Sequence, residues 1–187
     1  MTNLVKEIDR RRAFRALSSE PVPEETIQRM FQAATFAPSC YNNQPWRFVA
    51  VQDTDTLDAI KAQLSDGNAW AKTAPLIILA CTKASLDCRL DEGRDYAFFD
   101  LGLATMNLML QADHEGFVAH PIAGFNPKKI KNACKVPSDY VVVSLLICGK
   151  RGDNPALAEW QIEREKGARL RKPLIENCFY DTWKGSE

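Results

Sequence analysis

The sequence has no excess of charge of either sign, because 24 lysine and arginine residues balance 24 aspartate and glutamate residues. A neutral chain has no general attraction for a polyanion or for an anionic membrane. It also lacks any apolar run of the roughly 18 residues that a membrane span requires. Nucleic acids and membranes are therefore not expected partners. The opening MTNLVKEIDRRR does not resemble a secretory signal, and we expect a cytoplasmic protein.

Several motifs with well-known chemistry are also missing. The nine glycine residues form neither GxGxxG nor GxxxxGK, which argues against a Rossmann dinucleotide site and a P-loop. The six cysteine residues include no CxxC pair and have only two histidine residues as partners, so no metal site is expected. Cys81 and Cys148 lie in apolar runs, which predicts buried and unreactive thiols. No nucleophile elbow accompanies His120, and hydrolase chemistry has little support.

Length and composition predict one domain, residues 1–187, since 45% hydrophobic and 26% charged residues are typical of globular proteins. Residues 3–10 predict a short helix, and a second helix starts at Pro23 and ends before Pro38. Further helices are predicted in the amphipathic stretch around 57–64 and from Asn126-Pro127 onward. Residues 47–52, 76–81 and 140–148 predict strands, the last two covered on both faces. Together they predict an α+β fold with one mixed or antiparallel sheet flanked by helices.

The segment 97–112 predicts a helix that is apolar nearly all round. Only Asp100, Thr105, Asn107 and Gln111 interrupt its apolar residues. A helix without a polar face must be covered on every side, and in a chain of this size a second subunit is the simplest cover. The pattern predicts a homodimer, and Leu108→Glu is expected to disrupt it.

Three motifs follow one another in the first third of the chain: RRxxR at residues 11–15, a helix starting at PVPEE, and APSxxNxQPWRF at residues 37–48. Farther along come DLGLATMNLMLQADHEGFVAHPIAGF at 100–125 and RLRKPL at 169–174. In this order the motifs resemble the nitroreductase family of FMN-dependent enzymes. The resemblance extends from about residue 8 to residue 174. It implies the nitroreductase-like fold and the assembly of two chains into an intertwined homodimer.

The basic residues suit the phosphate of FMN, because the planar guanidinium group forms two charge-assisted hydrogen bonds. The candidates are Arg11, Arg12, Arg169 and Arg171. The alternative interpretation of each is an arginine that is solvated at the protein surface and binds no ligand. By resemblance, Arg15 lies near N1 and the C2 carbonyl of the flavin, where negative charge accumulates on reduction. Ala13 stands where the family often has serine, which leaves only a backbone contact.

The resemblance places further residues around the ring. A loop expected to reach the flavin across the dimer interface contains Pro38, Ser39, Cys40, Asn42 and Gln44. Its alternative interpretation is a helix-ending proline followed by a polar turn. The pyrimidine edge is assigned to Asn68 and Lys72, on a weaker match. The face of the ring is assigned to Pro121, Ile122, Ala123 and Gly124, unless Gly124 is an ordinary turn glycine. Cys40 replaces a serine of the family, and we assign it no catalytic role.

The resemblance implies an NAD(P)H-dependent reductase of small electrophiles such as nitroaromatics or quinones. No catalytic constellation of side chains accompanies the flavin motifs, so hydride transfer is expected at flavin N5, with no metal and no catalytic side chain. Nicotinamide is expected to bind at one face of the flavin ring and leave before the acceptor binds at the same site, which implies ping-pong kinetics. Two alternatives remain: a flavin-binding storage or sensor protein without turnover, and a family offshoot with dehalogenase or flavin-fragmenting chemistry.

Overall fold

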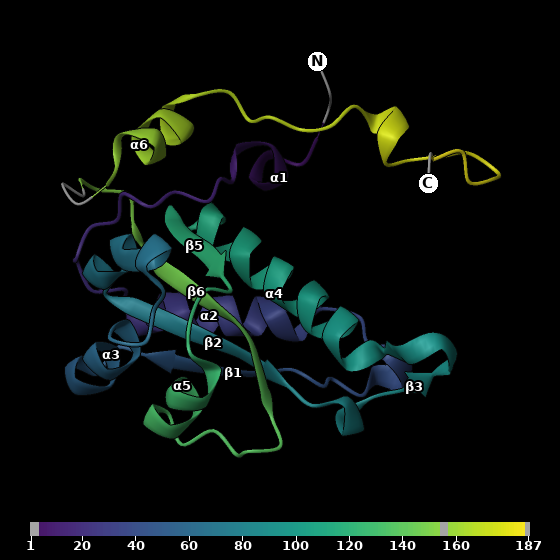
Figure 1. The fold of residues 1–187 in the computed structure, drawn as a ribbon, viewed down its shortest axis with the longest axis horizontal. Helices are drawn as coiled ribbons and strands as arrows, with labels where there is room; N and C mark the ends of the chain where they lie inside the picture. The colour runs from purple at the N-terminus through teal and green to yellow at the C-terminus, as the bar shows by residue number, and fades with distance from the viewer. Residues whose placement is uncertain (1–3, 154–156, 186–187) are drawn as a thin grey trace. The chain divides into compact units, whose positions relative to one another are not determined.

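The computed structural model describes residues 4–153 and 157–185, which form two compact units divided between Leu157 and Ala158. The first unit contains one four-stranded sheet in the order β1-β2-β6-β5 (Figure 1). Its strands are β1 (Arg47–Val51), β2 (Leu76–Thr82), β5 (Phe117–Ile122) and β6 (Val141–Lys150). All neighbouring pairs are antiparallel, which confirms the predicted α+β fold and selects the antiparallel form of the sheet.

The predicted helices are present with slightly different ends. The first unit contains α1 (Lys6–Arg10), α2 (Glu24–Thr35), α3 (Thr54–Lys61), α4 (Tyr96–His114) and α5 (Pro127–Ala133). It also contains the 3-10 segments η1 (Cys40–Asn42), η2 (Asp66–Thr73), η3 (Ala84–Leu86) and η4 (Asp91–Gly93), and a hairpin of β3 (Arg89–Leu90) and β4 (Arg94–Asp95). The second unit contains α6 (Glu159–Lys166) and η5 (Leu174–Glu176). Among the residues described, no helix has the length and apolarity needed to cross a membrane.

Side-chain caps explain where two of these helices begin. The Asp53 carboxylate accepts a hydrogen bond from the Thr56 backbone N–H at the start of α3. The Asn126 side chain does the same for the Lys129 N–H at the start of α5, where Pro127 stands in the first turn. Each cap satisfies a backbone donor that has no partner inside the helix.

The sheet is covered on both faces, as the near-continuous apolar strands predicted. Leu76, Ile78 and Ala80 of β2 join the core that includes α2 and α4, whereas the alternate residues of β2 join the core that includes α3 and α5. Figure 1 shows these helix pairs on opposite sides of the sheet. Every residue of β2 is buried. Because full burial of one aliphatic side chain contributes roughly 1.5–3 kcal/mol, this central strand stabilises both cores.

The resemblance places residues 121–124 in a glycine-containing flavin loop, and this expectation needs a correction because the first two of them belong to a strand. Pro121 and Ile122 form the end of β5, an edge strand that pairs with β6 only. Proline is tolerated at an edge because its missing N–H faces away from the partner strand. The sequence signal failed here because Pro121 and Gly124 are typical of loops. Only Ala123 and Gly124 follow the strand.

The prediction that Leu108→Glu disrupts a dimer interface was also wrong in its physical basis, because Leu108 is not on a free side of the helix. Leu108 is completely buried against the sheet, in the core of its own chain. The buried side of α4 is formed by Ala97, Leu101, Ala104, Leu108 and Ala112, whose spacing of three or four residues marks one helical face. A charge at Leu108 would therefore disrupt the folded chain itself, and not selectively an interface.

A partly buried ion pair ties α2 to the end of α4. Arg29 Nη2 lies 2.6 Å from Glu115 Oε2, and the Glu115 side chain is only 13% exposed. The Arg29 hydrogen bond lowers the pKa of Glu115 to about 2, with a smaller contribution from Gln111. Since the folded pKa lies below the ordinary value of 4.5, the pair stabilises the fold above that pH. This stabilisation is lost as pH falls through about 2.

We predict that Glu115→Gln lowers the free energy of unfolding at pH 7 by about 1–2 kcal/mol, after allowance for solvent at the half-exposed Arg29. The difference from the parent protein should shrink as pH falls from 4.5 toward 2. Urea unfolding at pH 7 and pH 3 measures both effects. The matched control is Glu25→Gln, since Glu25 lies 3.8 Å from the same Arg29 but is 86% exposed. Equal losses in the two variants would contradict this assignment.

Candidate functional site

The segment that carries the predicted phosphate-binding arginines is extended and lies beside the end of β6. Leu17 and Arg151 form an antiparallel bridge. The Ser18 N–H donates to the Lys150 carbonyl at 2.9 Å, and the Gly152 N–H donates to the Ala16 carbonyl at 3.0 Å. These bonds fix the backbone directly after residue 15, and so give the preceding arginines a defined position.

A basic cleft of about 330 Å³ adjoins this segment. Its lining includes three consecutive arginines, Arg10, Arg11 and Arg12, and also Arg151. Arg10 is neutralised, because its Nε lies 2.6 Å from Asp113 Oδ2 at the end of α4. Arg12 and Arg151 lie over one aromatic side chain, with their guanidinium carbons 5.8 and 3.9 Å from the centre of the Phe14 ring. The cleft thus combines several cations with only one acidic lining residue, which suits an anionic group.

Arg15 is positioned by two residues to which the sequence analysis assigned no role at the site. Its guanidinium carbon lies 5.9 Å from the centre of the Trp70 ring, and that ring packs 4.6 Å from the ring of His120. His120 is buried, and its Nδ1 lies 3.0 Å from the Phe14 carbonyl oxygen. Because a carbonyl only accepts, Nδ1 carries the proton. His120 and Trp70 therefore hold the backbone and side chain of the Phe14–Arg15 step. Their places in the sequence could have suggested them, because Trp70 lies between Asn68 and Lys72 and His120 directly precedes Pro121.

Two predicted ring-binding residues, Asn68 and Gly124, lie together. The Gly124 carbonyl accepts from the Ser65 N–H at 3.0 Å and from the Asn68 amide at 2.9 Å. A Cβ at position 124 would lie 2.7 Å from the Asn68 amide nitrogen, so a larger residue would require the Asn68 side chain to move. The glycine thus favours the close packing of these two segments. Lys72 lies exposed on the same 3-10 segment as Asn68.

The remaining residues assigned to the ring face differ in exposure. Pro121 and Ala123 are exposed, whereas the Ile122 side chain is buried in the core. Only the backbone of Ile122 is therefore available to a ligand. In the N-terminal segment Ala13 is exposed, while Arg11, Arg12 and Arg15 are half-buried.

The loop of residues 38–44 is exposed except at the half-buried Ser39 and Cys40, and its backbone is conformationally unusual. Tyr41, Asn42 and Gln44 all have positive φ, at 49°, 58° and 50°. Such backbone costs roughly 1–3 kcal/mol per non-glycine residue and persists only where the surroundings hold it. The Ser39 hydroxyl accepts from the Gln44 N–H at 3.0 Å, and the Cys40 N–H donates to the Asp100 carboxylate at 2.8 Å. Burial raises the pKa of Asp100 despite this bond. Tyr41, at 92% exposed, extends into solvent.

Within one chain the two groups of predicted site residues are far apart. The 38–44 loop is held by Asp100 near the start of α4, whereas the basic segment is held by Asp113 near its end. Thirteen residues of helix separate these contacts by about 20 Å, at about 1.5 Å per residue. The structure therefore does not bring the loop and the arginine cleft of the same chain around one small ligand. Arg169 and Arg171 belong to the second unit, where Arg171 donates to the Leu170 carbonyl.

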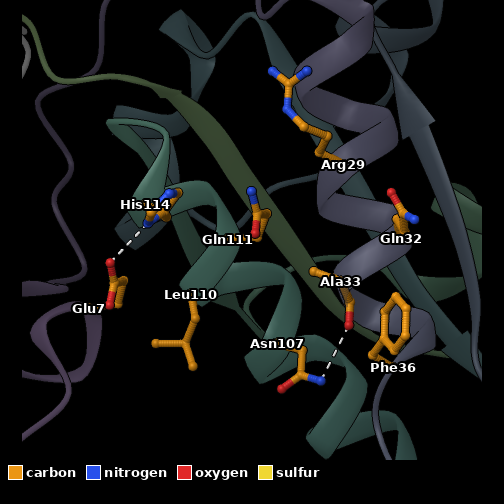
Figure 2. A pocket seen from close by; sticks show the side chains of 9 residues that line it. All are labelled: Glu7, Arg29, Gln32, Ala33, Phe36, Asn107, Leu110, Gln111 and His114. Atoms are coloured by element: carbon orange, nitrogen blue, oxygen red, sulfur yellow. Dashed lines mark hydrogen bonds and ion pairs between the residues drawn. The ribbon is translucent and has the colours of Figure 1, made fainter.

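A second hollow, of about 560 Å³, lies between α2 and α4 (Figure 2). Several of its polar side chains already have partners: the Asn107 amide donates to the Ala33 carbonyl at 3.2 Å, and His114 pairs with Glu7 at 3.0 Å. Leu110 and Phe36 supply its apolar surface. Because these polar groups are paired inside the chain, the hollow suits packing better than recognition of a charged ligand.

Comparison with known proteins gives a consistent result. The model of the nitroreductase family matches residues 8–150. A NADH dehydrogenase of Thermus thermophilus is 28% identical over 172 residues, covering 75% of this chain and 82% of its own length. The FMN reductase (NAD(P)H) of Bacillus subtilis is 24% identical over 172 residues, covering 83% and 69%. A solved structure described as an oxidoreductase containing FMN superposes with a TM-score of 0.86 at 28% identity, covering 98% and 94%.

The family match includes the basic segment, the 38–44 loop, α4 and β5, which are the elements that hold most of the predicted site. The similarity thus extends across most of the first unit and confirms the resemblance inferred from the motifs. The chain belongs to the nitroreductase family.

Proposed function

We propose that this protein binds FMN and uses NAD(P)H to reduce small electrophiles such as nitroaromatics or quinones, in the cytoplasm. The observation that carries the proposal is the arginine-lined cleft beside Arg15, whose position depends on Trp70 and His120. The similarity to an FMN reductase and to an FMN-containing oxidoreductase supports the same cofactor. We further propose that the residues assigned above from the family motifs hold the flavin.

The residues of the chain fit such a cofactor by their chemistry. Half-buried arginines that share one cleft can bind a phosphate dianion with charge-assisted hydrogen bonds. Bound FMN would supply the hydride and electron chemistry. Arg15 keeps its charge at all relevant pH values, so it can stabilise negative charge that develops on a ligand beside it. The His120–Phe14 bond keeps the Arg15 backbone in place while that charge changes.

The proposed active unit is a homodimer in which each flavin site combines two chains. The side of α4 that its own chain leaves partly uncovered is apolar and consists of Phe99, Leu103, Met106 and Leu110. Phe99 is 60% exposed, and Phe36, which lines the same hollow as Leu110, is 77% exposed. If two α4 helices pack antiparallel about a two-fold axis, the start of one lies beside the end of the other. The 38–44 loop of one chain then approaches the arginine cleft of its partner.

We predict that the purified protein is yellow and releases FMN, not FAD, on denaturation. Arg11→Ala should weaken FMN binding by roughly 1.5–3 kcal/mol, because a charge-assisted bond to the phosphate is lost. Arg171→Ala should have an effect of the same size if the second unit contributes to the phosphate site. Flavin fluorescence titration measures the affinities, with Arg89→Ala on the exposed hairpin as the control. A protein that takes up no FMN would falsify the cofactor assignment.

We predict that Phe99→Asp yields a folded monomer that has lost its flavin, because a charge in the apolar interface costs several kcal/mol. Leu108→Glu, by contrast, should unfold the chain. The control Val141→Asp changes an apolar residue of similar exposure, 45%, at the start of β6 and should stay dimeric. Sedimentation and circular dichroism distinguish the three results. A flavin-loaded monomer at micromolar concentration would overturn the shared-site dimer.

We predict that Arg15→Gln lowers the potential of the bound flavin and slows its reduction by NAD(P)H more than it destabilises the fold. Double-reciprocal plots of the initial rate at several acceptor concentrations should give parallel lines, because NAD(P)H and the acceptor bind in turn to one site. Arg94→Gln, on the exposed hairpin, serves as the charge-matched control. Intersecting lines would show that NAD(P)H and the acceptor do not use one binding site in turn. Sustained NAD(P)H oxidation with a quinone at constant flavin content separates this function from storage, sensing and flavin fragmentation.

A further inference from the structure

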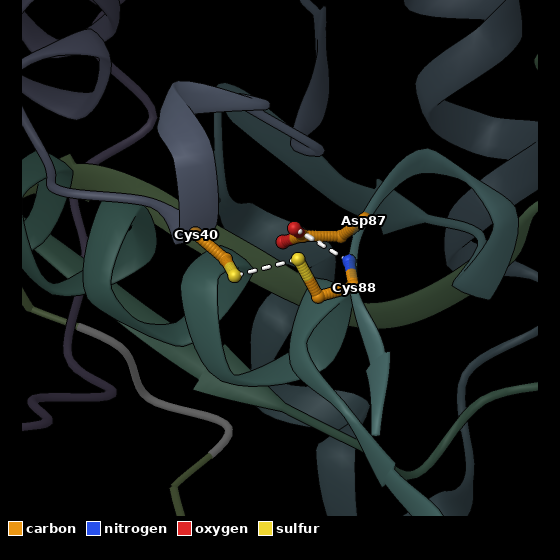
Figure 3. A group of neighbouring side chains, drawn as sticks. All are labelled: Cys40, Asp87 and Cys88. Carbon is orange, nitrogen blue, oxygen red and sulfur yellow. Dashed lines mark hydrogen bonds between the residues drawn. The ribbon is translucent and has the colours of Figure 1, made fainter.

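Two cysteines that are distant in sequence meet beside the 38–44 loop. The Cys40 and Cys88 sulfur atoms lie 2.6 Å apart (Figure 3), well inside the van der Waals contact of two sulfur atoms. Both side chains are half-buried. Cys40 begins η1 within the loop, and Cys88 precedes the β3–β4 hairpin.

Neighbouring hydrogen bonds hold both cysteines in this arrangement. The Cys40 N–H is bound to Asp100, and the Cys88 N–H donates to the Asp87 carboxylate at 2.8 Å. The same Asp87 oxygen accepts from the Asn43 amide at 2.9 Å, which joins the two segments directly. The contact between the sulfurs therefore lies within a bonded network and does not depend on two mobile side chains.

We propose that Cys40 and Cys88 form a reversible intrachain disulfide when the protein meets a peroxide, and that this bond fastens the 38–44 loop to the segment before β3. A disulfide requires the sulfurs to approach to about 2.05 Å, a further movement of about 0.6 Å. Side-chain rotation can supply such a movement. The inference rests on the positions of these residues and does not depend on the proposed flavin chemistry.

A metal site fits the same residues less well. Cys40, Asp87 and Cys88 offer one ligand atom each within 4.8 Å. Two thiolates bound tetrahedrally to one zinc ion, each at about 2.3 Å, lie about 3.7 Å apart, much farther than the sulfurs here. A structural zinc site also requires four protein ligands, and the described residues offer three at this place. The short sulfur distance favours direct bonding.

The redox step balances with hydrogen peroxide as the oxidant. The Cys40 thiolate attacks one peroxide oxygen and breaks the O–O bond, which gives a sulfenic acid and hydroxide. The Cys88 sulfur then attacks the sulfenic sulfur, the S–S bond forms, and water leaves with the Cys88 proton. Together two thiols and one peroxide give one disulfide and two waters. A dithiol reductant reverses the reaction by thiol–disulfide exchange.

The surroundings of the remaining cysteines affect how readily each thiol reacts with peroxide. Hydrogen bonding to Cys40, together with burial, raises the pKa of Cys88 to about 11, which suits the second, resolving position better than the first attack. Burial raises the pKa of Cys81 to about 12, and it also raises the pKa values of Cys134 and Cys148. These three thiols are therefore poor competitors. Cys178 is exposed and provides an internal reference for simple surface oxidation.

The test is to treat the full-length protein with a small excess of hydrogen peroxide, block the free thiols, and map disulfides after trypsin cleavage. We expect one linked product that joins peptide 30–47 to peptide 84–89, lighter by two hydrogens than the sum of its parts. A phosphine reductant should separate the peptides. The oxidised protein should unfold about 5–10 °C above the reduced form, because the bond closes a long chain loop.

Three variants serve as matched controls. Cys40→Ser and Cys88→Ser should each abolish the linked product and the thermal shift, whereas Cys178→Ser should retain both. Metal analysis of the untreated protein provides a measurement independent of oxidation. The proposal is overturned if the two thiols alkylate separately after peroxide, if Cys40 stops at sulfinic acid, or if stoichiometric zinc is bound and is released by blocking both thiols.

Discussion

Helix α4 is the element on which the remaining structure depends, because it must be covered on nearly every side. Ala104, Leu108 and Ala112 pack against α2 and the sheet, and this packing accounts for one side of the helix. Three of the four polar residues that interrupt its sequence are used within the chain: Asp100 binds the 38–44 loop, Asn107 binds α2, and Gln111 binds Glu115. One helix therefore joins the core, the loop and the ion pair that holds α2.

The helix also separates the two groups of proposed site residues. Its start holds the loop and its end holds Arg10 through Asp113. The rigid rod between them keeps two sets of residues apart that the family motifs assign to one flavin. Because the helix has a fixed length, the two sets of one chain cannot both contact the same flavin. Either a partner chain supplies one of the sets, or the two sets bind different ligands. The uncovered apolar side of the same helix favours the partner chain.

Local patterns predicted the fold well where one type of signal dominated. The near-continuous apolar residues of β2 and β6 predicted strands covered on both faces, and Asn126-Pro127 predicted the start of α5. Prediction failed where two signals competed. Pro121 made the end of β5 resemble a loop, and the apolar pattern of α4 did not reveal that Leu108 belongs to the inner side.

Contacts between distant segments could not be predicted from spacing at all. Trp70 and His120 lie 50 positions apart and position Arg15 only because η2 and β5 meet on one side of the sheet. Cys40 and Cys88 are likewise brought together by folding, because 48 positions separate them in the sequence. Residues assigned from family motifs, such as Arg11 and Asn68, were identified by their order along the chain, which carries no information about these supporting contacts.

The distance along α4 between Asp100 and Asp113 has a consequence for mixtures of variants. In the proposed dimer, each chain supplies the loop to one site and the arginines to the other. A chain impaired in the loop and a chain impaired in the arginines would each be inactive as a pure homodimer. Combined in one heterodimer, both lesions fall in the same site and the other site is intact. Subunit exchange between two inactive proteins would thus restore activity through complementation.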